Sequence, residues 1–309
     1  MWLIKTYSNG DIEWDKTFED AYGHCVRQTS DGGYIITGFT DYNVDACLIK
    51  TDSQGNLEWK KTFGGNFWEF GECVLQTNDG GYIMTGAFNY DYDTDTSELW
   101  LIKTDSDGNL EWEKKFGESA GWDRGYYLLQ TEDGGYIITG EKWVGILPSP
   151  VVWLIKTDSE GNMIWEKTYK PGFLSLEGGS CVQQTMDGGY IITGTKFYPT
   201  PGYNDVLLIK TDQNGNLQWE RTFSRGDWDV GHSVKQTPDG GYIIAGETDG
   251  TASGYDDIWV IKTDEYGKIK SKALTRSLSF RILEKLLERF PLLERLFSLP
   301  IFTRLLNLK

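Results

Sequence analysis

An eight-residue segment, DGGYIITG or a close variant, occurs five times in the 309-residue chain and constrains its fold more than any other feature. Each copy follows a G-x-x-(V/L)-x-Q-T segment and precedes a WLIKT-like segment, and in the first four units a GNLEW-like segment comes next. Tandem units of about 50 residues are typical of repeat architectures. The copies begin at Asp31, Asp79, Asp133, Asp187 and Asp239, at spacings of 48, 54, 54 and 52 residues.

Each of the four segments predicts a β-strand, because it is short, rich in β-branched and aromatic residues, and bounded by Gly, Asp or Asn. We name the strands A (G-x-x-V-x-Q-T), B (YIITG), C (WLIKT) and D (GNLEW). Four strands per unit predict an all-β fold, a β-propeller of four-stranded antiparallel blades. We expect five complete blades from about Gly23 to Ser271. An N-terminal C–D pair, Trp2 to Trp14, is expected to form a half-blade at a sixth ring position, or to stack outside a closed five-blade ring.

The run from Ile102 to Trp112, IKTDSDGNLEW, resembles the tryptophan-docking motif of pyrroloquinoline-quinone-type (quinoprotein-like) propellers. Gly108 stands four residues before Trp112, and three other units keep this spacing, although the turn is one residue shorter and lacks the family's Ala and Thr. The repeats are also similar to Gly/Asp-rich repeats of secreted bacterial and archaeal proteins. The resemblance covers residues 1–271 and implies that the tryptophan packs between neighbouring blades. It also favours the cell envelope or the extracellular space.

The charge of the chain is unevenly distributed. Nine Lys/Arg and three Glu give the segment from Lys270 to Lys309 a net charge of +6, which leaves −22 on the other residues. An acidic body repels phosphate backbones, so we expect no nucleic-acid partner.

Cys25, Cys73 and Cys181 occupy the same repeat position, and equivalent positions in separate units are usually too far apart to form a disulfide. We therefore interpret them as small buried residues.

The sequence has no strong catalytic signature, and we expect neither catalytic residues, a metal site nor a cofactor. His24 and His232 occupy a repeat position where other units carry Glu, Tyr or Ser, which argues against a dedicated metal ligand. The D-x-D-G-N run at Asp105–Asn109 is reminiscent of half a calcium loop. A hairpin turn in which Asp105 bonds its own backbone and Gly108 is left-handed explains it better.

The B–C connections vary in length and sequence, and they emerge on the same face as the D–A connections. Variable aromatic loops on a rigid scaffold are typical binding positions, although aromatic side chains also cover the ends of such rings. Acidic residues two positions before strand A either cap the backbone or form an acidic collar around a ligand. The candidate ligand-binding residues are Tyr42, Tyr90, Tyr92, Trp143, Tyr198, Tyr203, Tyr255, Glu69, Asp123, Glu177 and Asp229.

The last segment, 272–309, is expected to form a basic amphipathic helical tail separate from the propeller at 1–271. Its apolar positions recur with helical spacing, and charged residues fill the opposite face. Pro291 and Pro300 should interrupt the helix. No transmembrane segment and no signal peptide are recognised in the sequence. The residues expected to contact an anionic membrane, a partner or the propeller are Ile282, Leu283, Leu286, Leu287, Phe290, Arg281, Lys285 and Arg289.

Together these patterns favour a non-enzymatic binding or scaffold propeller that holds a protein or carbohydrate-like ligand on its loop face. The tail would attach it to a membrane surface or a partner. Two alternatives stay open, a quinone-dependent dehydrogenase and a purely structural propeller.

Overall fold

The computed structural model of the chain contains 21 β-strands and no helix in the residues that it describes. These residues are 1–41, 44–65, 67–91, 96–117, 121–144, 150–169, 176–198, 203–249 and 257–269, without the side chains of 176–177. All strand pairs within the sheets are antiparallel, and the strands of each sheet follow one another in chain order. The chain is therefore an all-β repeat protein consistent with a propeller.

The sheets correspond to the sequence repeats. β1 (Trp2–Thr6) and β2 (Ile12–Thr17) form a two-stranded sheet. The first blade contains β3 (Ala21–Gln28), β4 (Tyr34–Thr40), β5 (Ala46–Thr51) and β6 (Leu57–Phe63), and the second contains β7 (Trp68–Gln76), β8 (Tyr82–Asp91), β9 (Thr96–Thr104) and β10 (Leu110–Phe116). The third blade contains β11 (Arg124–Gln130), β12 (Tyr136–Trp143), β13 (Pro150–Thr157) and β14 (Met163–Tyr169). The fourth contains β15 (Leu176–Gln184), β16 (Tyr190–Tyr198), β17 (Tyr203–Thr211) and β18 (Leu217–Phe223). The fifth blade has three strands in its described part, β19 (Asp229–Gln236), β20 (Tyr242–Thr248) and β21 (Asp257–Lys262), and a bridge from Thr263 to Ile269.

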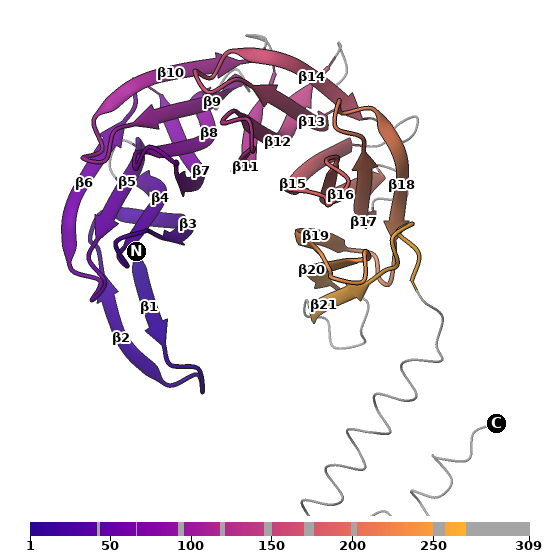
Figure 1. Ribbon diagram of the computed structural model, residues 1–309, viewed down its shortest axis with the longest axis horizontal. Helices are drawn as coiled ribbons and strands as arrows, with labels where there is room; N and C mark the ends of the chain where they lie inside the picture. The colour runs from indigo at the N-terminus through magenta and orange to yellow at the C-terminus, as the bar shows by residue number, and fades with distance from the viewer. Residues whose placement is uncertain are drawn as a thin grey trace, which may run out of the picture.

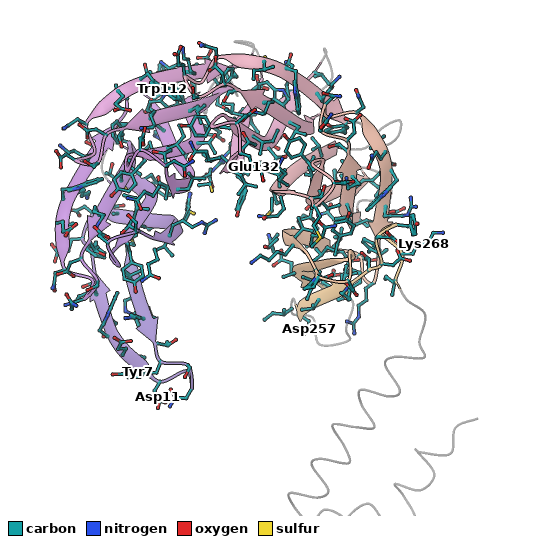
Figure 2. The ribbon with its side chains drawn as sticks, viewed as in Figure 1. Tyr7, Asp11, Trp112, Glu132, Asp257 and Lys268 are labelled. Atoms are coloured by element: carbon teal, nitrogen blue, oxygen red, sulfur yellow. The ribbon has the colours of Figure 1, made fainter. Side chains whose placement is uncertain are left out.

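The sheets stand side by side in an arc that is open between the β1–β2 hairpin and β19–β21 (Figure 1). Each A strand (β3, β7, β11, β15 and β19) lies on the inside of the arc, and the D strands lie on its outer rim. The β1–β2 hairpin continues the arc beyond the first blade, with Tyr7 and Asp11 at its tip (Figure 2). Residues 1–17 therefore form the expected C–D pair.

The core lies between neighbouring blades, where B and C strands pack their apolar faces together. Ile83, Leu99 and Leu101 of the second blade join Ile138 and Trp153 of the third in one buried cluster. The glycine that opens each A strand permits this close approach. A Cβ atom on Gly71, for example, would lie 2.0 Å from the Thr37 hydroxyl oxygen of the preceding blade.

A tryptophan on each D strand joins one blade to the next. Trp112, on the outer strand β10 (Figure 2), packs against the turn glycine Gly161 of the third blade, and its ring lies 6.2 Å from that of Tyr136. The same contacts link Trp14 of the hairpin to Gly55 and Tyr34 of the first blade. The packing of the tryptophan between neighbouring blades is thus confirmed.

We expect Trp112→Ala to lower the free energy of unfolding by about 3 kcal/mol, because it removes an aromatic side chain from a packed interface. Urea denaturation followed by circular dichroism measures the change. Leu110→Ala on the same strand is the control, since Leu110 is exposed and should contribute less than about 0.5 kcal/mol. Equal losses in the two variants would contradict the docking role.

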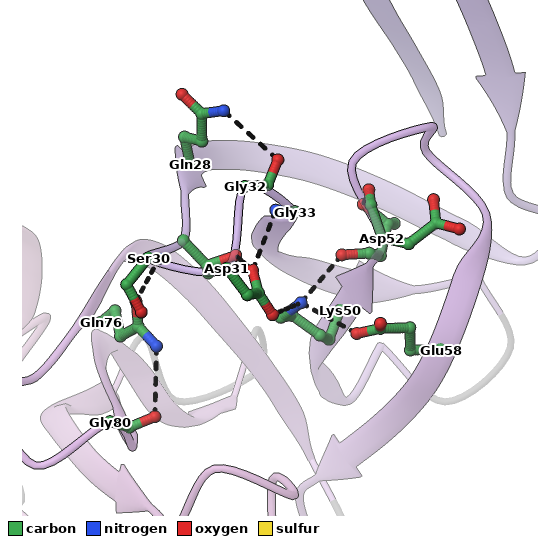
Figure 3. A network of polar contacts seen from close by, with 12 residues as sticks. Gln28, Ser30, Asp31, Gly32, Gly33, Lys50, Asp52, Glu58, Gln76 and Gly80 are labelled. Atoms are coloured by element: carbon green, nitrogen blue, oxygen red, sulfur yellow. Dashed lines mark hydrogen bonds and ion pairs between the residues drawn. The ribbon is translucent and has the colours of Figure 1, made fainter.

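The A–B hairpins are held by a lysine from strand C, and this lysine is buried in the first four blades. Lys50 donates hydrogen bonds to Asp31 Oδ2 (2.8 Å), Glu58 Oε2 (2.8 Å) and the Thr51 carbonyl oxygen (2.9 Å) (Figure 3). The next blade contributes as well, because the Gln76 side chain accepts a hydrogen bond from the Ser30 amide and donates one to Gly80. The corresponding pairs are Lys103–Asp79, Lys156–Asp133, Lys210–Asp187 and Lys262–Asp239. The same lysine–aspartate contact therefore recurs at the D-G-G hairpin of all five repeat units.

The hairpin aspartates should make the fold sensitive to acid. Hydrogen bonds from Lys50 and Thr29 lower the pKa of Asp31 from its ordinary 3.8 to about 2. Burial opposes ionisation of Asp79, Asp133 and Asp187, but hydrogen bonds from a threonine and a lysine outweigh it and lower each pKa to about 2. Because these groups bind protons more weakly in the folded chain, their stabilisation is complete above pH 4 and is lost as the pH falls towards 2.

Thermal unfolding at pH 5, 4, 3 and 2 tests this expectation. The midpoint should be steady between pH 5 and 4 and fall steeply below it, and Asp31→Asn should reduce the steepness. A midpoint that does not change between pH 4 and pH 2 would contradict the role of the hairpin aspartates.

The turns between strands C and D also match the sequence interpretation. Asp105 Oδ1 accepts hydrogen bonds from the amides of Asp107 (2.9 Å) and Asn109 (2.8 Å), and Gly108 has φ +75°. The D-x-D-G-N run is thus a hairpin turn.

The helical tail at 272–309 and its eight candidate residues lie outside the described residues, so the expectations about membrane or partner contacts stay predictions. No helix able to cross a bilayer occurs in the described part of the chain.

Candidate functional site

A β-bulge in every A strand directs one side chain towards the inside of the arc. The pairing of β3 with β4 shifts between Gly23 and Cys25, so His24 is an extra residue without a partner position on β4. The same shift recurs in the other four blades. Bulges often redirect side chains beside functional sites. The five bulge residues are His24, Glu72, Tyr126, Ser180 and His232.

All five bulge residues line one cavity of about 950 Å³ on the inside of the arc. Other parts of its wall come from Glu141 at the end of β12, Phe197 at the end of β16 and Trp228 in the last D–A connection. Because these positions adjoin the B–C and D–A connections, the cavity lies towards that face of the arc. Two other cavities among the described residues are smaller, with volumes of about 430 and 210 Å³.

Charged and polar side chains of the first three blades form a chain of contacts along the cavity wall. His24 Nδ1 lies 3.2 Å from Glu72 Oε2, and the Arg124 guanidinium donates to Glu72 Oε1. Arg124 also lies over the ring of Tyr126, with 5.3 Å to the ring centroid. The Tyr126 hydroxyl donates a 2.6 Å hydrogen bond to Glu141 Oε1. Three side chains, His24, Arg124 and Tyr126, are thus connected to the two carboxylates of Glu72 and Glu141.

The pKa values of the two carboxyl groups are shifted in opposite directions. Burial opposes ionisation of Glu72, but the hydrogen bond from His24 and the charge of Arg124 outweigh it, so the pKa of Glu72 lies below its ordinary value of 4.5. Burial raises the pKa of Glu141 above 4.5, and the Tyr126 hydrogen bond only partly offsets this. The hydrogen bond to Glu72 raises the pKa of His24. The cavity therefore holds one carboxyl group that ionises more readily than an ordinary glutamate and one that ionises less readily.

Aromatic rings continue from this polar chain towards the loop face. Phe70 lies beneath Arg124, 5.1 Å from the guanidinium, and its ring is 5.8 Å from that of Tyr90. Tyr90 is 5.5 Å from Trp122, and Trp122 is 5.5 Å from Trp143. The cluster thus brings together Tyr90 and Trp143, which lie 53 positions apart in the sequence.

The other candidate aromatic residues have different positions. Tyr198 and Tyr203 face each other across the β16–β17 connection, with 4.6 Å between ring centroids. None of the described candidates lines the cavity wall. Tyr42, Tyr92 and Tyr255 lie outside the described residues, and so does the side chain of Glu177. The assignment of these residues to a ligand stays a prediction.

The described acidic candidates face loop backbone. Asp123 Oδ1 accepts a hydrogen bond from the Trp143 amide (2.9 Å), and Asp229 Oδ2 accepts from the amides of Arg225 (2.6 Å) and Gly226 (3.0 Å). Glu69 is fully buried, and burial raises its pKa. Asp123 and Asp229 therefore act as backbone caps, one of the two interpretations considered.

One interpretation of the A strands needs correction, that of the cysteines. The variation at the His24 position argued only against a dedicated metal ligand, and this variable repeat position is the bulge that lines the cavity. The cysteines were expected to lie too far apart for a disulfide, but Cys25 Sγ lies 4.0 Å from Cys73 Sγ. Equivalent residues of neighbouring A strands converge because these strands lie on the inside of the arc. The sequence did contain a signal for this cavity, because the repeat position of His24 varies among His, Glu, Tyr and Ser while the rest of the repeat is nearly uniform.

No group of three or more His, Cys, Asp or Glu side chains suited to a metal occurs among the described residues. No protein-family model matches the sequence, and no curated protein matches it.

Solved structures with a similar fold are β-propeller-like glycoside hydrolases. The α-L-arabinanase of Penicillium chrysogenum, solved with arabinobiose, is 11% identical, with a TM-score of 0.50 over 79% of this chain and 81% of that chain. The α-L-arabinofuranosidase of Lactobacillus brevis is 9% identical, with a TM-score of 0.50 over 82% of this chain and 96% of that chain. At this identity the likeness establishes a shared propeller fold, and it does not single out the quinoprotein-like type.

The expectation of a non-enzymatic scaffold is corrected by these matches. The solved structures that share the fold are enzymes acting on glycosides, and they favour neither a quinone-dependent dehydrogenase nor a purely structural propeller.

Proposed function

We propose that the chain is a glycoside-processing enzyme whose reaction takes place in the inner cavity. The observation that carries this proposal is the pair Glu72 and Glu141, two carboxyl groups of one cavity wall whose pKa values are shifted in opposite directions. Glycosidic bonds are commonly cleaved by one carboxylic acid and one carboxylate on either side of the bond. Opposite pKa shifts in such a pair assign the two roles.

Glu141 is the proposed general acid. Its burial favours the protonated form, which can donate a proton to the oxygen of the leaving sugar. The Tyr126 hydroxyl holds one carboxyl oxygen and leaves the other for the proton. Tyr126 therefore acts as a positioning residue for Glu141.

Glu72 is the proposed anionic partner. His24 and Arg124 keep it ionised, so it can act as a base towards water or stabilise positive charge that develops on the sugar ring. The rate should fall as the pH drops through the lowered pKa of Glu72. It should fall again as the pH rises through the raised pKa of Glu141.

The aromatic cluster of Phe70, Tyr90, Trp122 and Trp143 supports a carbohydrate substrate. Aromatic faces suit the apolar faces of sugar rings. The cluster starts next to Arg124 and runs towards the loop face, so a chain of sugars could lie along it with one end at the carboxylates. The names of the similar solved structures suggest arabinose-containing oligosaccharides as the first substrates.

Incubation of the full chain with α-linked arabino-oligosaccharides tests the proposal, with released sugars separated by chromatography. We expect release by the native chain and by Glu160→Gln, a control on an exposed C–D turn. Glu72→Gln should release at least tenfold less. If no sugar is released and tryptophan fluorescence does not respond to any of the oligosaccharides, the proposal is wrong.

A further inference from the structure

Two cysteines from neighbouring blades lie side by side in the cavity wall. Cys25 on β3 and Cys73 on β7 are 48 positions apart in the sequence, and their Sγ atoms are 4.0 Å apart. Both are free thiols, and both line the inner cavity. Cys25 is partly exposed and also borders a second, smaller cavity, whereas Cys73 is 1% exposed. A disulfide needs an S–S distance of about 2.05 Å, so the two Sγ atoms must approach each other by about 2 Å for the bond to form.

The surroundings of the pair favour a reactive Cys25. Arg27, two residues along the same strand, interacts electrostatically with the Cys25 thiol. It is held by the Tyr127 hydroxyl, to which it donates a 3.1 Å hydrogen bond. The hydrogen bond with Cys73, aided by the charge of Arg27 and opposed by burial, lowers the pKa of Cys25. Glu72 opposes this shift, and the pKa of Cys73 is raised.

We propose that Cys25 and Cys73 form a redox-active dithiol that closes to a disulfide between the first two blades when a hydroperoxide enters the inner cavity. The thiolate of Cys25 attacks one oxygen of hydrogen peroxide, the O–O bond breaks, and the other oxygen leaves as water after taking a proton. Cys73 then attacks the sulfenic sulfur, the S–S bond forms, and the second oxygen leaves as water. Two thiols lose two electrons and two protons, and one peroxide is reduced to two waters.

The other two cysteines lack these features. Cys47 is completely buried, and burial raises its pKa to about 11. Cys181 has the same repeat position as Cys25, but it is buried, its pKa is raised by burial, and its Sγ contacts the Val182 and Val234 carbonyl oxygens. The equivalent positions in the neighbouring blades are Tyr127 and Ser233, which leave Cys181 without a second thiol there. Cys181 is thus an internal control.

Treatment of the reduced full chain with a small excess of hydrogen peroxide at pH 7 tests the proposal. Tryptic peptides 17–27 and 62–103 separate the two cysteines, so mass spectrometry without reduction detects a cross-link directly. We expect this cross-link in monomeric protein, and two of the four thiols should become unreactive in denaturant. Retention of all four thiols, or over-oxidation of Cys25 without a cross-link, would overturn the proposal.

Variants separate the role of Cys25, which reacts with peroxide, from that of Cys73, which then forms the disulfide. In Cys73→Ser, dimedone should trap a sulfenic acid on Cys25, because the second thiol is missing. Arg27→Gln should slow the cross-link about threefold or more, since less Cys25 is ionised at pH 7. Cys181→Ser should form the cross-link at the native rate. If dimedone labels Cys181 before Cys25, or if Cys181→Ser abolishes the cross-link, the assignment is wrong.

Discussion

Gly194→Ala should destabilise the chain by about 3 kcal/mol or more, which is a large part of the stability of a typical domain. Gly194 lies on β16 and pairs with Gly179 of β15 just before the β-bulge. A Cβ atom there would lie 1.8 Å from the carbonyl oxygen of Gly178 and 3.1 Å from the Gly179 Cα atom. Backbone atoms of a paired strand cannot move aside without breaking the sheet. Urea denaturation measures the loss, and soluble yield is a second readout if the variant fails to fold.

Gly65→Ala is the matched control for this prediction. A Cβ atom on Gly65 would meet its nearest neighbour, Glu69 Oε1, at 3.6 Å, which is an ordinary contact. We expect a change of less than about 0.5 kcal/mol. If Gly194→Ala is as stable as Gly65→Ala, the bulge does not require a glycine opposite it.

Glu141→Gln should reduce the rate of oligosaccharide cleavage by about 10²- to 10⁴-fold, the usual contribution of a general acid. Glutamine keeps the size of the side chain and can still accept the Tyr126 hydrogen bond, but it cannot donate an acidic proton. Chromatography of released sugars at a saturating substrate concentration measures the loss. The alkaline limb of the pH profile should disappear with it, since that limb reports the titration of Glu141.

A substrate with a better leaving group distinguishes proton donation from a merely structural role. A 2,4-dinitrophenyl glycoside departs with little help from an acid, so Glu141→Gln should cleave it at close to the native rate. Tyr126→Phe should lower the rate on oligosaccharides less than Glu141→Gln does. Equal losses of Glu141→Gln on both substrates would refute the acid role.

The repeats predict most of the local structure, because each blade uses the same short-range chemistry. Hairpin aspartates, turn glycines such as Gly108 and the docking tryptophans depend on neighbours within one blade or the next. Their spacing in the sequence is therefore enough to predict the strands and the order of the strands. The N-terminal hairpin also follows from counting C and D segments.

The cavity could not be predicted in the same way, because its residues come from five blades. His24, Glu72 and Tyr126 look like tolerated variation when the repeats are aligned one above another. They become neighbours only when the A strands converge on the inside of the arc and the bulges direct them inwards. The aromatic loop residues were recognised, but the sequence did not indicate that Trp122 joins Tyr90 to Trp143.

The sequence by itself determined the all-β repeat fold, the order of its strands and the contacts that join successive blades, since all of these depend on residues at fixed spacings. Only the tertiary structure decided which side chains share the cavity. The proximity of Cys25 to Cys73 and the opposite pKa shifts of Glu72 and Glu141 arise from the curvature of the arc and from the surroundings that it creates. The sequence of a single repeat predicts neither the curvature nor the burial, because both depend on how the blades pack together.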